Sequence, residues 1–351
     1  MKAARLVAFR EPLAVEDVPT PSPQGDEALV RLTAVGICRS DWHRWNGDLG
    51  WVGIKPRLPM TLGHEIGGTV EAVGPDVRAL RPGRRVTVPF LQACGQCDNC
   101  RAGRDNLCLR GQFAGFNRDG GFAEYVLVRN ADLNCVPLPD TISDEVAAAL
   151  GCRFTTGYHA IAHRAQVRAG DWIAIFGAGG VGLSAIQTAA ALGARAIAVD
   201  IDAGKLELAA RAGAVATVRA GDGPVPQRIR ELSGGGVTRS VDAIASAATT
   251  QQAIASLRPG GRHVQVGLTS AEDKGQIAIP ADLLVNTELE IVGSASNPHG
   301  SYGEIFDLIA QGKLDPAALI ARRVGLRDVT SVLHDFDTFA THGLDVVTSF
   351  A

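Results

Sequence analysis

The sequence predicts two domains, a barrel-like β domain and a doubly wound α/β domain, on the strength of three observations. The chain has 351 residues, too many for one ordinary hydrophobic core. Its first half consists of short runs of alternating apolar and polar residues, separated by Pro and Gly. From about residue 155, apolar strands alternate instead with helical segments, and one strand leads into a glycine-rich turn. We therefore expect the domain change near residue 155.

Composition and charge are typical of a soluble globular enzyme. Hydrophobic residues make up 46% of the chain and charged residues 20%. The net charge of -3 and the lack of any Lys/Arg run argue against nucleic-acid binding. No apolar stretch approaches the ~20 residues of a membrane helix, and the first residues lack the apolar core of a secretory signal. Because the number of cysteines is odd, seven, and six of them fall into two metal-ligand sets, we expect a cytoplasmic enzyme without disulfides.

The first half is predicted to be rich in β-strands. Alternating runs predict strands at residues 28–35, 68–73, 85–88 and 123–128, after a first strand within residues 1–12. Breakers rich in Pro and Gly, at residues 18–23 and 81–83, separate these runs. We expect a barrel-like all-β domain with the metal motifs in its loops.

The second half is predicted to hold a six-stranded sheet. A strand at residues 172–176 precedes the glycine-rich turn and an Ala-rich helix to about Leu192. Further strands are expected at residues 196–200, 215–218, 240–244, 263–266 and 289–293, and a second helix at 205–212. The last fifty residues, with a helix near 302–311, leave this pattern. We expect them to return to the first domain and make it discontinuous.

The glycine-rich turn, Gly177-Ala-Gly-Gly-Val-Gly182, predicts a dinucleotide site. Gly177 permits the tight turn, Gly179 lets the backbone approach a pyrophosphate, and Gly182 allows close packing of helix on sheet. Asp200 ends the next strand, where its carboxylate can accept hydrogen bonds from the adenosine ribose. A carboxylate there would repel a 2′-phosphate, so NAD is favoured over NADP. A turn without a ligand is the alternative, which the strand before and the helix after disfavour.

Four closely spaced cysteines predict a structural zinc site. Cys94, Cys97, Cys100 and Cys108 follow the pattern Cys-x2-Cys-x2-Cys-x7-Cys. Four thiolates can surround a tetrahedral ion and leave no position for a substrate. A DNA-binding finger would need a basic recognition helix, and an iron–sulfur cluster would need a different ligand run. The loop is polar and has little hydrophobic core of its own, so we expect the bound metal to stabilise its fold instead.

A second set of metal ligands is spread along the chain. Cys38, His64 and Cys152 would leave the fourth position of a zinc ion open, as catalytic sites do. Asp41 could orient His64 through its other ring nitrogen, and Glu65 could approach the metal or its surroundings. The remaining cysteine, Cys135, is expected to be a small core residue.

Together these motifs resemble the zinc-containing medium-chain dehydrogenase family, the zinc-dependent alcohol dehydrogenases, over essentially the whole chain. The residues that carry the resemblance are Cys38-Arg-Ser-Asp-x-His43, Gly63-His-Glu65, the cysteine loop, Gly151-Cys152, and the glycine-rich turn with Asp200. The resemblance implies a GroES-like β-barrel catalytic domain of residues 1–153 and 296–351, and a doubly wound Rossmann domain of residues 154–295 that binds NAD. It also implies one catalytic and one structural zinc, and a homodimer or homotetramer.

The resemblance further implies the reaction, a reversible hydride transfer between an alcohol held at zinc and NAD that gives an aldehyde or ketone. Ser40 would accept the proton and pass it through the nicotinamide ribose to His43; as alternatives, Ser40 is a turn hydroxyl and His43 a plain surface histidine. Arg39 would contact the pyrophosphate and Lys205 the ribose. The expected catalytic residues are Ser40, Asp41, His43 and Glu65, and the expected cofactor-binding residues are Arg39, Thr156, Gly177, Gly179, Gly180, Val181, Gly182, Asp200 and Lys205.

Two residues depart from the family pattern. Asp345 stands in the final strand, where the family often has an arginine near the cofactor phosphates. Arg153 directly follows Cys152, where a small residue is common. Arg153 could contact the substrate or cofactor, or pair with Glu65.

The substrate class is less determined than the reaction. A cysteine rather than a glutamate as the third protein ligand favours simple alcohols over polyols by analogy. Four aromatic residues are expected either to line a substrate pocket or, equally, to lie in the core: Trp42, Trp51, Phe90 and Phe116. Arg44 and Arg57 are expected to be surface charges rather than contacts for a polar substrate. Two alternatives remain open, a polyol, amino-alcohol or thiol-adduct dehydrogenase and a non-catalytic nucleotide-binding scaffold.

Overall fold

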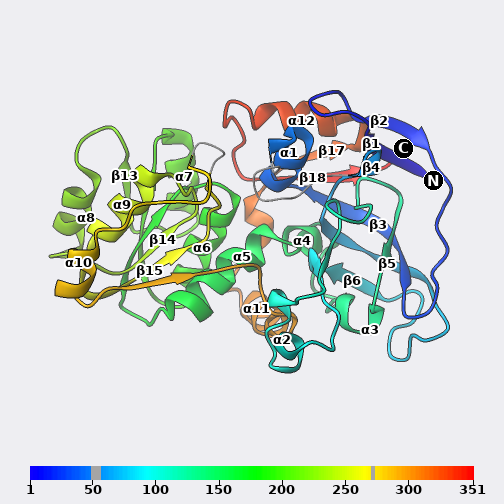
Figure 1. Ribbon diagram of the computed structural model, residues 1–351, viewed down its shortest axis with the longest axis horizontal. Coiled ribbons are helices and arrows are strands. Elements are labelled where there is room, and N and C mark those ends of the chain that lie inside the picture. The colour runs from blue at the N-terminus through cyan, green and yellow to red at the C-terminus, as the bar shows by residue number, and fades with distance from the viewer. Residues whose placement is uncertain (49–56, 270–272) are drawn as a thin grey trace. The chain divides into compact units, whose positions relative to one another are not determined.

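A computed structural model describes residues 1–48, 57–269 and 273–351, which form two compact units (Figure 1). One unit comprises Met1–Arg153, Ser296–Ala310 and Pro316–Ala351, and the other comprises Phe154–Ala295 and Gln311–Asp315. Trp51 lies outside the described residues. The sequence assigned residues 311–315 to the first domain, but the structure holds them in the second unit. The Gln187 side chain bonds both backbone groups of Asp315, at 2.8 and 2.9 Å.

The first unit is built on a seven-stranded sheet around β3 (Ala28–Ile37). The order is β10-β6-β5-β3-β18-β17, with β9 also paired to β3. Its other members are β5 (Glu65–Val73), β6 (Arg85–Val88), β9 (Tyr125–Val128), β10 (Val136–Pro137), β17 (Ile320–Gly325) and β18 (Leu344–Ser349). Nearly every residue of β3 is buried, which explains its apolar composition. Cys135 lies in the same core, as expected.

Two smaller sheets accompany the seven-stranded sheet. One is β2-β1-β4 and the other is β7-β8. Their bounds are β1 (Lys2–Leu6), β2 (Ala14–Asp17), β4 (Met60–Thr61), β7 (Leu91–Gln92) and β8 (Gln112–Phe113). The predicted first strand is therefore present, although the predicted strand 123–128 begins only at Tyr125.

The C-terminal segment completes the first unit. Strand β18 pairs antiparallel with β3, with Val346 opposite Gly36, and β17 lies parallel to β18. Figure 1 shows these C-terminal strands beside the blue β3. Residues separated by three hundred positions are thus neighbours in one sheet, and the sequence pattern of the last fifty residues changes for this reason.

The helices of the first unit are short. They are α1 (Arg39–Asn46), α2 (Asp98–Arg101), α3 (Ala131–Asn134), α4 (Asp144–Ala149), α11 (Tyr302–Ala310) and α12 (Val329–Asp335). Ser143 caps the start of helix α4, because its hydroxyl accepts a hydrogen bond from the Val146 amide. It packs closely on β5, because a Cβ at Gly67 would lie 2.4 Å from the Asp144 carbonyl. This packing presents the chain after α4, including Cys152, to the start of β5.

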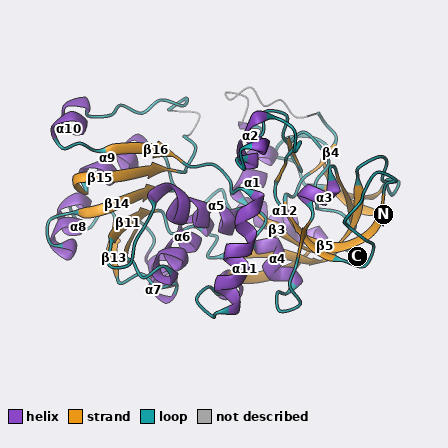
Figure 2. Ribbon diagram, turned by 90° about the horizontal axis from the view of Figure 1, so that it is seen from below, coloured by secondary structure: helices purple, strands orange, loops and turns teal. Residues whose placement is uncertain are grey.

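The second unit is a parallel six-stranded sheet, as predicted. The strands are β11 (Trp172–Phe176), β12 (Arg195–Asp200), β13 (Ala216–Arg219), β14 (Val237–Asp242), β15 (Leu257–Gln265) and β16 (Glu290–Gly293). Their order, β13-β12-β11-β14-β15-β16, is the 3-2-1-4-5-6 order of a Rossmann fold. The helices are α5 (Arg153–His159), continued by a π-helix at Ala160–Ala165, α6 (Gly180–Ala191), α7 (Ala203–Arg211), α8 (Val225–Ser233), α9 (Ala247–Ala255) and α10 (Ala281–Asn286). Figure 2 shows the strands side by side with helices packed against them.

One strand boundary differs from the prediction for a visible reason. The sequence predicts a strand at 240–244, but β14 ends at Asp242. The buried Asp242 carboxylate accepts hydrogen bonds from the amides of Ile244 and Ala245, which turns the chain out of the sheet. Among the described residues, no helix has the length and apolar composition needed to cross a membrane.

Candidate active site and metal centres

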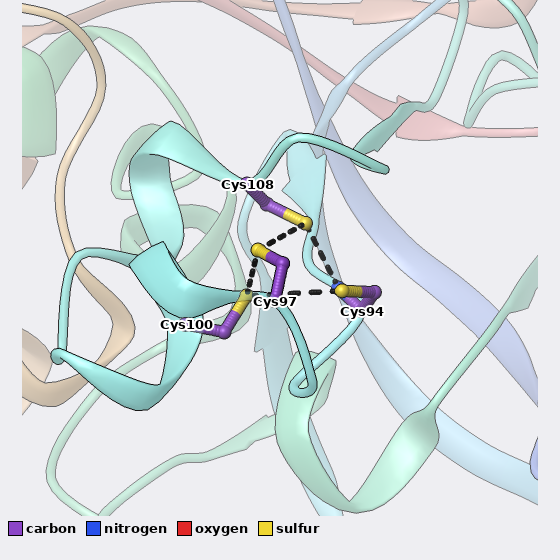
Figure 3. A group of neighbouring side chains, drawn as sticks. All are labelled: Cys94, Cys97, Cys100 and Cys108. Atoms are coloured by element: carbon purple, nitrogen blue, oxygen red, sulfur yellow. Dashed lines mark hydrogen bonds between the residues drawn. The ribbon is translucent and has the colours of Figure 1, made fainter.

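Four cysteine thiols meet in the loop between β7 and β8 (Figure 3). Cys97 caps α2, and its sulfur lies 3.5 Å from Cys100 Sγ and 3.9 Å from Cys108 Sγ. Cys94 Sγ lies 4.0 Å from Cys100 Sγ. Four sulfurs at about 2.3 Å from a tetrahedral zinc would lie about 3.8 Å apart. The arrangement therefore fits a zinc ion without rearrangement.

The thiols of this loop differ in acidity because their surroundings differ. The backbone N–H of Gln96 lowers the pKa of Cys94 to about 6. Burial raises the pKa of Cys100 to about 12. Cys94 therefore loses its proton more readily than Cys100. A metal ion that binds all four sulfurs as thiolates must displace the thiol protons that remain.

The cysteine loop is anchored to two other parts of the first unit. Asn134, which is fully buried, accepts a hydrogen bond from the Ala93 amide and donates one to the Ala93 carbonyl. Asp105 Oδ1 accepts a hydrogen bond from the His299 backbone amide at 2.9 Å, and His299 Nδ1 lies 3.0 Å from the same oxygen. Sequence reasoning missed the Asp105–His299 contact, because the two residues are 194 positions apart.

The second ligand set comes together at the ends of three buried elements. Cys38 follows β3 and caps α1, His64 precedes β5, and Cys152 follows α4. Their exposed fractions are 5%, 1% and 9%. One donor atom from each of these residues, together with a carboxylate oxygen of Glu65, lies within 4.8 Å of the others. Residues from three regions of the sequence thus form one compact donor cluster.

Asp41 joins two of these ligand segments. Its fully buried carboxylate accepts hydrogen bonds from the Cys38 amide at 2.9 Å and the Gly63 amide at 3.0 Å. The same carboxylate lies 2.9 Å from His64 Nδ1. The other ring nitrogen, Nε2, is buried and has no hydrogen-bond partner among the described residues. With Nδ1 donating to Asp41, the lone pair of Nε2 remains for a metal.

The acid–base properties of the cluster also suit a cation. Burial opposes protonation of His64, but the Asp41 carboxylate outweighs it and raises the pKa of His64 well above its usual value. The hydrogen bond between the two thiols holds the pKa of Cys38 well below its usual value and raises that of Cys152. A buried site that accumulates protons and a thiolate in this way is suited to exchange those protons for a metal ion.

Arg153 pairs with Glu65, which is one of the interpretations that the sequence left open; a contact of Arg153 with the substrate or cofactor stays a prediction. Its Nε lies 2.9 Å from Oε1 and its backbone amide donates to the same oxygen at 3.0 Å. Its Nη2 donates to Oε2. The side chains are 6% and 0% exposed. Burial raises the pKa of Glu65, partly offset by the charge of Arg153.

The candidate proton-relay residues lie on α1. Ser40 is half-buried, and its Oγ lies 3.8 Å from Cys38 Sγ. His43 Nδ1 lies 2.9 and 3.0 Å from the two carboxylate oxygens of Asp48, and the His43 side chain is 35% exposed. Asn46 also donates to Asp48. Sequence reasoning missed Asp48, although its position five residues after His43 was a usable signal.

Two aromatic rings hold the guanidinium of Arg39. Trp42 and Phe339 lie on it, with ring centroids 4.4 and 4.3 Å from its central carbon. Arg39 Nη1 also donates to the Phe336 carbonyl at 3.0 Å. Trp42 is thus a partner of Arg39. The pyrophosphate contact expected of Arg39 stays a prediction.

The two remaining aromatic candidates contact the buried histidine. The rings of Phe90 and Phe116 meet His64 edge-on, at centroid distances of 6.0 and 5.5 Å. The prediction that Arg44 lies at the surface is wrong, because Arg44 is only 1% exposed. It donates to the Phe116 carbonyl and to Met60 Sδ. Arg57 is exposed, as expected.

In the second unit, the glycine-rich turn has the shape of a phosphate-binding loop. Gly177 has φ +92°, and a Cβ at Gly182 would lie 1.7 Å from the Gly177 carbonyl oxygen. A Cβ at Gly179 would meet nothing within 4 Å, so this side of the turn is open. Gly179 caps α6, whose first residues include Gly180 and Val181. Unpaired amides at this helix start can bind a phosphate.

Asp200 stands at the end of β12 beside this turn. Its carboxylate accepts hydrogen bonds from the Ala178 amide at 2.8 Å and the Asp202 amide at 3.0 Å. Lys205, in the first turn of α7, and Thr156, on α5, are both mostly buried. Two apolar side chains, Ile201 (70% exposed) and Ile244 (45% exposed), are exposed to solvent, and sequence reasoning did not single them out. Their position at strand ends, directly after Asp200 and close after Asp242, was the available signal.

Comparison with known proteins supports one family. Residues 24–140 match the model of the alcohol dehydrogenase GroES-like domain, and residues 180–311 match that of the zinc-binding dehydrogenase. An alcohol dehydrogenase of Geobacillus stearothermophilus is 39% identical over 94% of this chain and 95% of its own. An NAD-dependent alcohol dehydrogenase of Sulfurisphaera tokodaii is 33% identical over 99% of each chain. The solved structure of an alcohol dehydrogenase from Thermus sp. ATN1 matches with a TM-score of 0.91 and 33% identity, over 99% of this chain and 100% of its own. The chain therefore belongs to the zinc-containing medium-chain dehydrogenase family and is an oxidoreductase of the alcohol dehydrogenase type.

Proposed function

We propose that the chain oxidises a simple alcohol reversibly to an aldehyde or ketone, with NAD, at a zinc ion held by Cys38, His64 and Cys152. The observation that carries this proposal is the buried donor cluster, in which His64 Nε2 lacks a protein partner among the described residues. In this proposal the first unit carries both metal sites and the second unit binds NAD. The four cysteines of the loop hold a second, structural zinc.

The residues around the cluster would each have a defined task. When bound, zinc would polarise the alcohol hydroxyl so that its proton leaves near neutral pH, and NAD would accept the hydride. Asp41 holds His64 in the tautomer that leaves Nε2 for the metal. Ser40, next to Cys38, accepts the alcohol proton. His43, held by Asp48, takes it on toward the surface.

The cofactor preference rests on Asp200. Its buried carboxylate lies beside the open turn and would accept hydrogen bonds from the ribose while repelling a 2′-phosphate. Ile201 and Ile244 would flank the adenine, because both are exposed and Ile244 lies against Gly177. NAD is therefore the proposed cofactor.

The preference for simple alcohols rests on the apolar surroundings of His64. Phe90 and Phe116 contact the ring, and an apolar wall favours an alkyl or aryl group over a polyol. We further propose a cytoplasmic homodimer or homotetramer, because Leu283 and Val285 of this chain are exposed apolar side chains that a second copy could cover.

The decisive experiment follows reduced nicotinamide when zinc-loaded protein and NAD meet primary, secondary, aromatic, polyol and amino alcohols. We expect activity with simple alcohols and its loss, together with one zinc ion, in Cys152→Ala. Activity only with polyols or amino alcohols would favour the first alternative. No activity together with a single zinc per chain would favour the nucleotide-binding scaffold.

A further inference from the structure

Glu65 lies beside the proposed catalytic ligands and is itself a possible ligand. One of its carboxylate oxygens lies within 4.8 Å of the donor atoms of Cys38, His64 and Cys152. Glu65 is fully buried, so water does not compete for its oxygens. A zinc with four protein ligands is a closed, structural site, whereas a catalytic zinc needs an open position. The cluster therefore holds one donor more than an open catalytic site uses.

Arg153 forms hydrogen bonds with both oxygens of the Glu65 carboxylate. Its backbone amide and Nε donate to Oε1, and Nε and Nη2 also reach Oε2. A guanidinium that engages both oxygens fixes the plane of the carboxylate as well as its position. A rotation of Glu65 toward the metal would break several charge-assisted hydrogen bonds inside a buried site.

The backbone around the pair is shaped to hold it. A Cβ at Gly36, on β3, would lie 2.0 Å from Glu65 Oε2 and 3.0 Å from Arg153 Nη2. A Cβ at Gly151 would lie 2.6 Å from the Glu65 Cα. Neither glycine has a φ that demands glycine, so the missing side chains serve to make room. Two elements thus leave a slot that the ion pair fills.

A second negative charge, besides that of Glu65, stabilises the guanidinium of Arg153 in its position. Asp345 is buried on β18, and its carboxylate attracts the guanidinium of Arg153. Arg322 holds Asp345 through two hydrogen bonds, of 2.7 and 3.0 Å. Charges alternate from Glu65 through Arg153 and Asp345 to Arg322.

We infer that Arg153 is a positioning residue that holds the Glu65 carboxylate out of the metal coordination and so keeps the fourth position for the substrate. The inference rests on the proposed ligand set of Cys38, His64 and Cys152. Without Arg153, the carboxylate turns to the metal and becomes a fourth protein ligand. An alcohol must then displace it.

The test replaces the zinc of the buried site by cobalt(II), whose visible absorption reports the number and type of ligands. The variants are Arg153→Met, Arg153→Lys and the double variant Glu65→Gln with Arg153→Met. We expect Arg153→Met to change the cobalt spectrum, to slow cobalt loss to a chelator, and to raise KM for the alcohol roughly tenfold with less effect on kcat. Arg153→Lys should give values between those of the wild type and Arg153→Met, because an ammonium group cannot form a bidentate pair with both carboxylate oxygens. The double variant should recover the wild-type spectrum and KM.

Arg323→Gln is the matched control, because Arg323 forms a bidentate pair with Glu145 at the surface of the same unit. It should leave the spectrum unchanged. A wild-type cobalt spectrum in Arg153→Met with only a lower melting temperature would overturn the inference and leave the ligand set intact. If Arg153→Met does not fold, Arg153→Lys carries the same comparison. Failure of the wild type to bind cobalt in a Cys152-dependent manner would instead refute the ligand set itself.

Discussion

Replacing Asp41 by Asn is expected to weaken zinc binding at the buried site by about 10- to 100-fold. The two carboxylate oxygens of Asp41 serve different partners: Oδ1 faces the Gly63 amide and His64 Nδ1, and Oδ2 faces the Cys38 amide. Asn has one oxygen and one NH2 group. In either orientation, the NH2 group of Asn would face an N–H donor that now has an acceptor.

The size of the effect follows from the hydrogen bonds that are lost. A hydrogen bond to a charged group contributes about 1.5–3 kcal/mol, and about 1.4 kcal/mol corresponds to a factor of ten. The loss of one such bond at His64 therefore weakens binding by about one to two powers of ten. In the other orientation of the Asn side chain, the hydrogen bond is lost at the Cys38 amide instead, which would destabilise the start of α1 and displace the Cys38 ligand, because that amide is buried.

Competition with a chelator measures the zinc affinity of the buried site, and kcat/KM at saturating zinc measures the remaining activity. Asp17→Asn is the control, since Asp17 pairs with Lys2 at an exposed position. An unchanged zinc affinity in Asp41→Asn would refute the view that Asp41 positions His64 for a metal. Full recovery of activity by excess zinc would indicate that Asp41 acts on affinity alone.

Three further predictions concern other sites. Cys97→Ser should lower the melting temperature by at least about 4 °C, equivalent to about 1–2 kcal/mol, while changing turnover less; equal stability would refute a structural metal. Asp200→Gly should raise the NADP-to-NAD activity ratio roughly tenfold, measured as kcat/KM for each cofactor, and an unchanged ratio would contradict the assignment. Burial lowers the pKa of His159 to about 4, so the unfolded chain, with a pKa near 6.5, takes up the proton first as pH falls. Stability should therefore drop by up to about 3 kcal/mol between about pH 6.5 and 4, and denaturant unfolding of His159→Gln should lack this part of the decline.

The sequence predicted most of the fold, because the signals for it are local. The alternation of β11 with a glycine turn and an Ala-rich helix is readable within thirty residues, and the Rossmann order of the sheet follows from it. The family was also confirmed, since the motifs around Cys38, His64 and the cysteine loop are short and specific. Strand ends were less accurate. The end of β14 depends on the side chain of Asp242 rather than on hydrophobicity.

Contacts between distant residues were not readable in the same way. Arg44 looked like a surface charge because nothing near it in the sequence indicates burial; its partners, Met60 and Phe116, are 16 and 72 positions away. Residues 311–315 belong to the second unit, where the side chain of Gln187, on α6, bonds the backbone of Asp315. In both cases a side chain bonds a backbone group or a sulfur atom far away in the sequence, and no local pattern indicates such a contact.

The two departures from the family pattern, Asp345 and Arg153, are parts of one arrangement. The pairing of β18 with β3 places Asp345 opposite Ile37, next to the glycine that makes room for Glu65. An arginine at position 345 would add a cation beside Arg153, where repulsion in a buried site is costly. An aspartate there attracts Arg153 instead. The cation that pairs with Glu65 is therefore Arg153, the residue after Cys152. With an arginine in that place, an aspartate at position 345 is favoured over a second arginine.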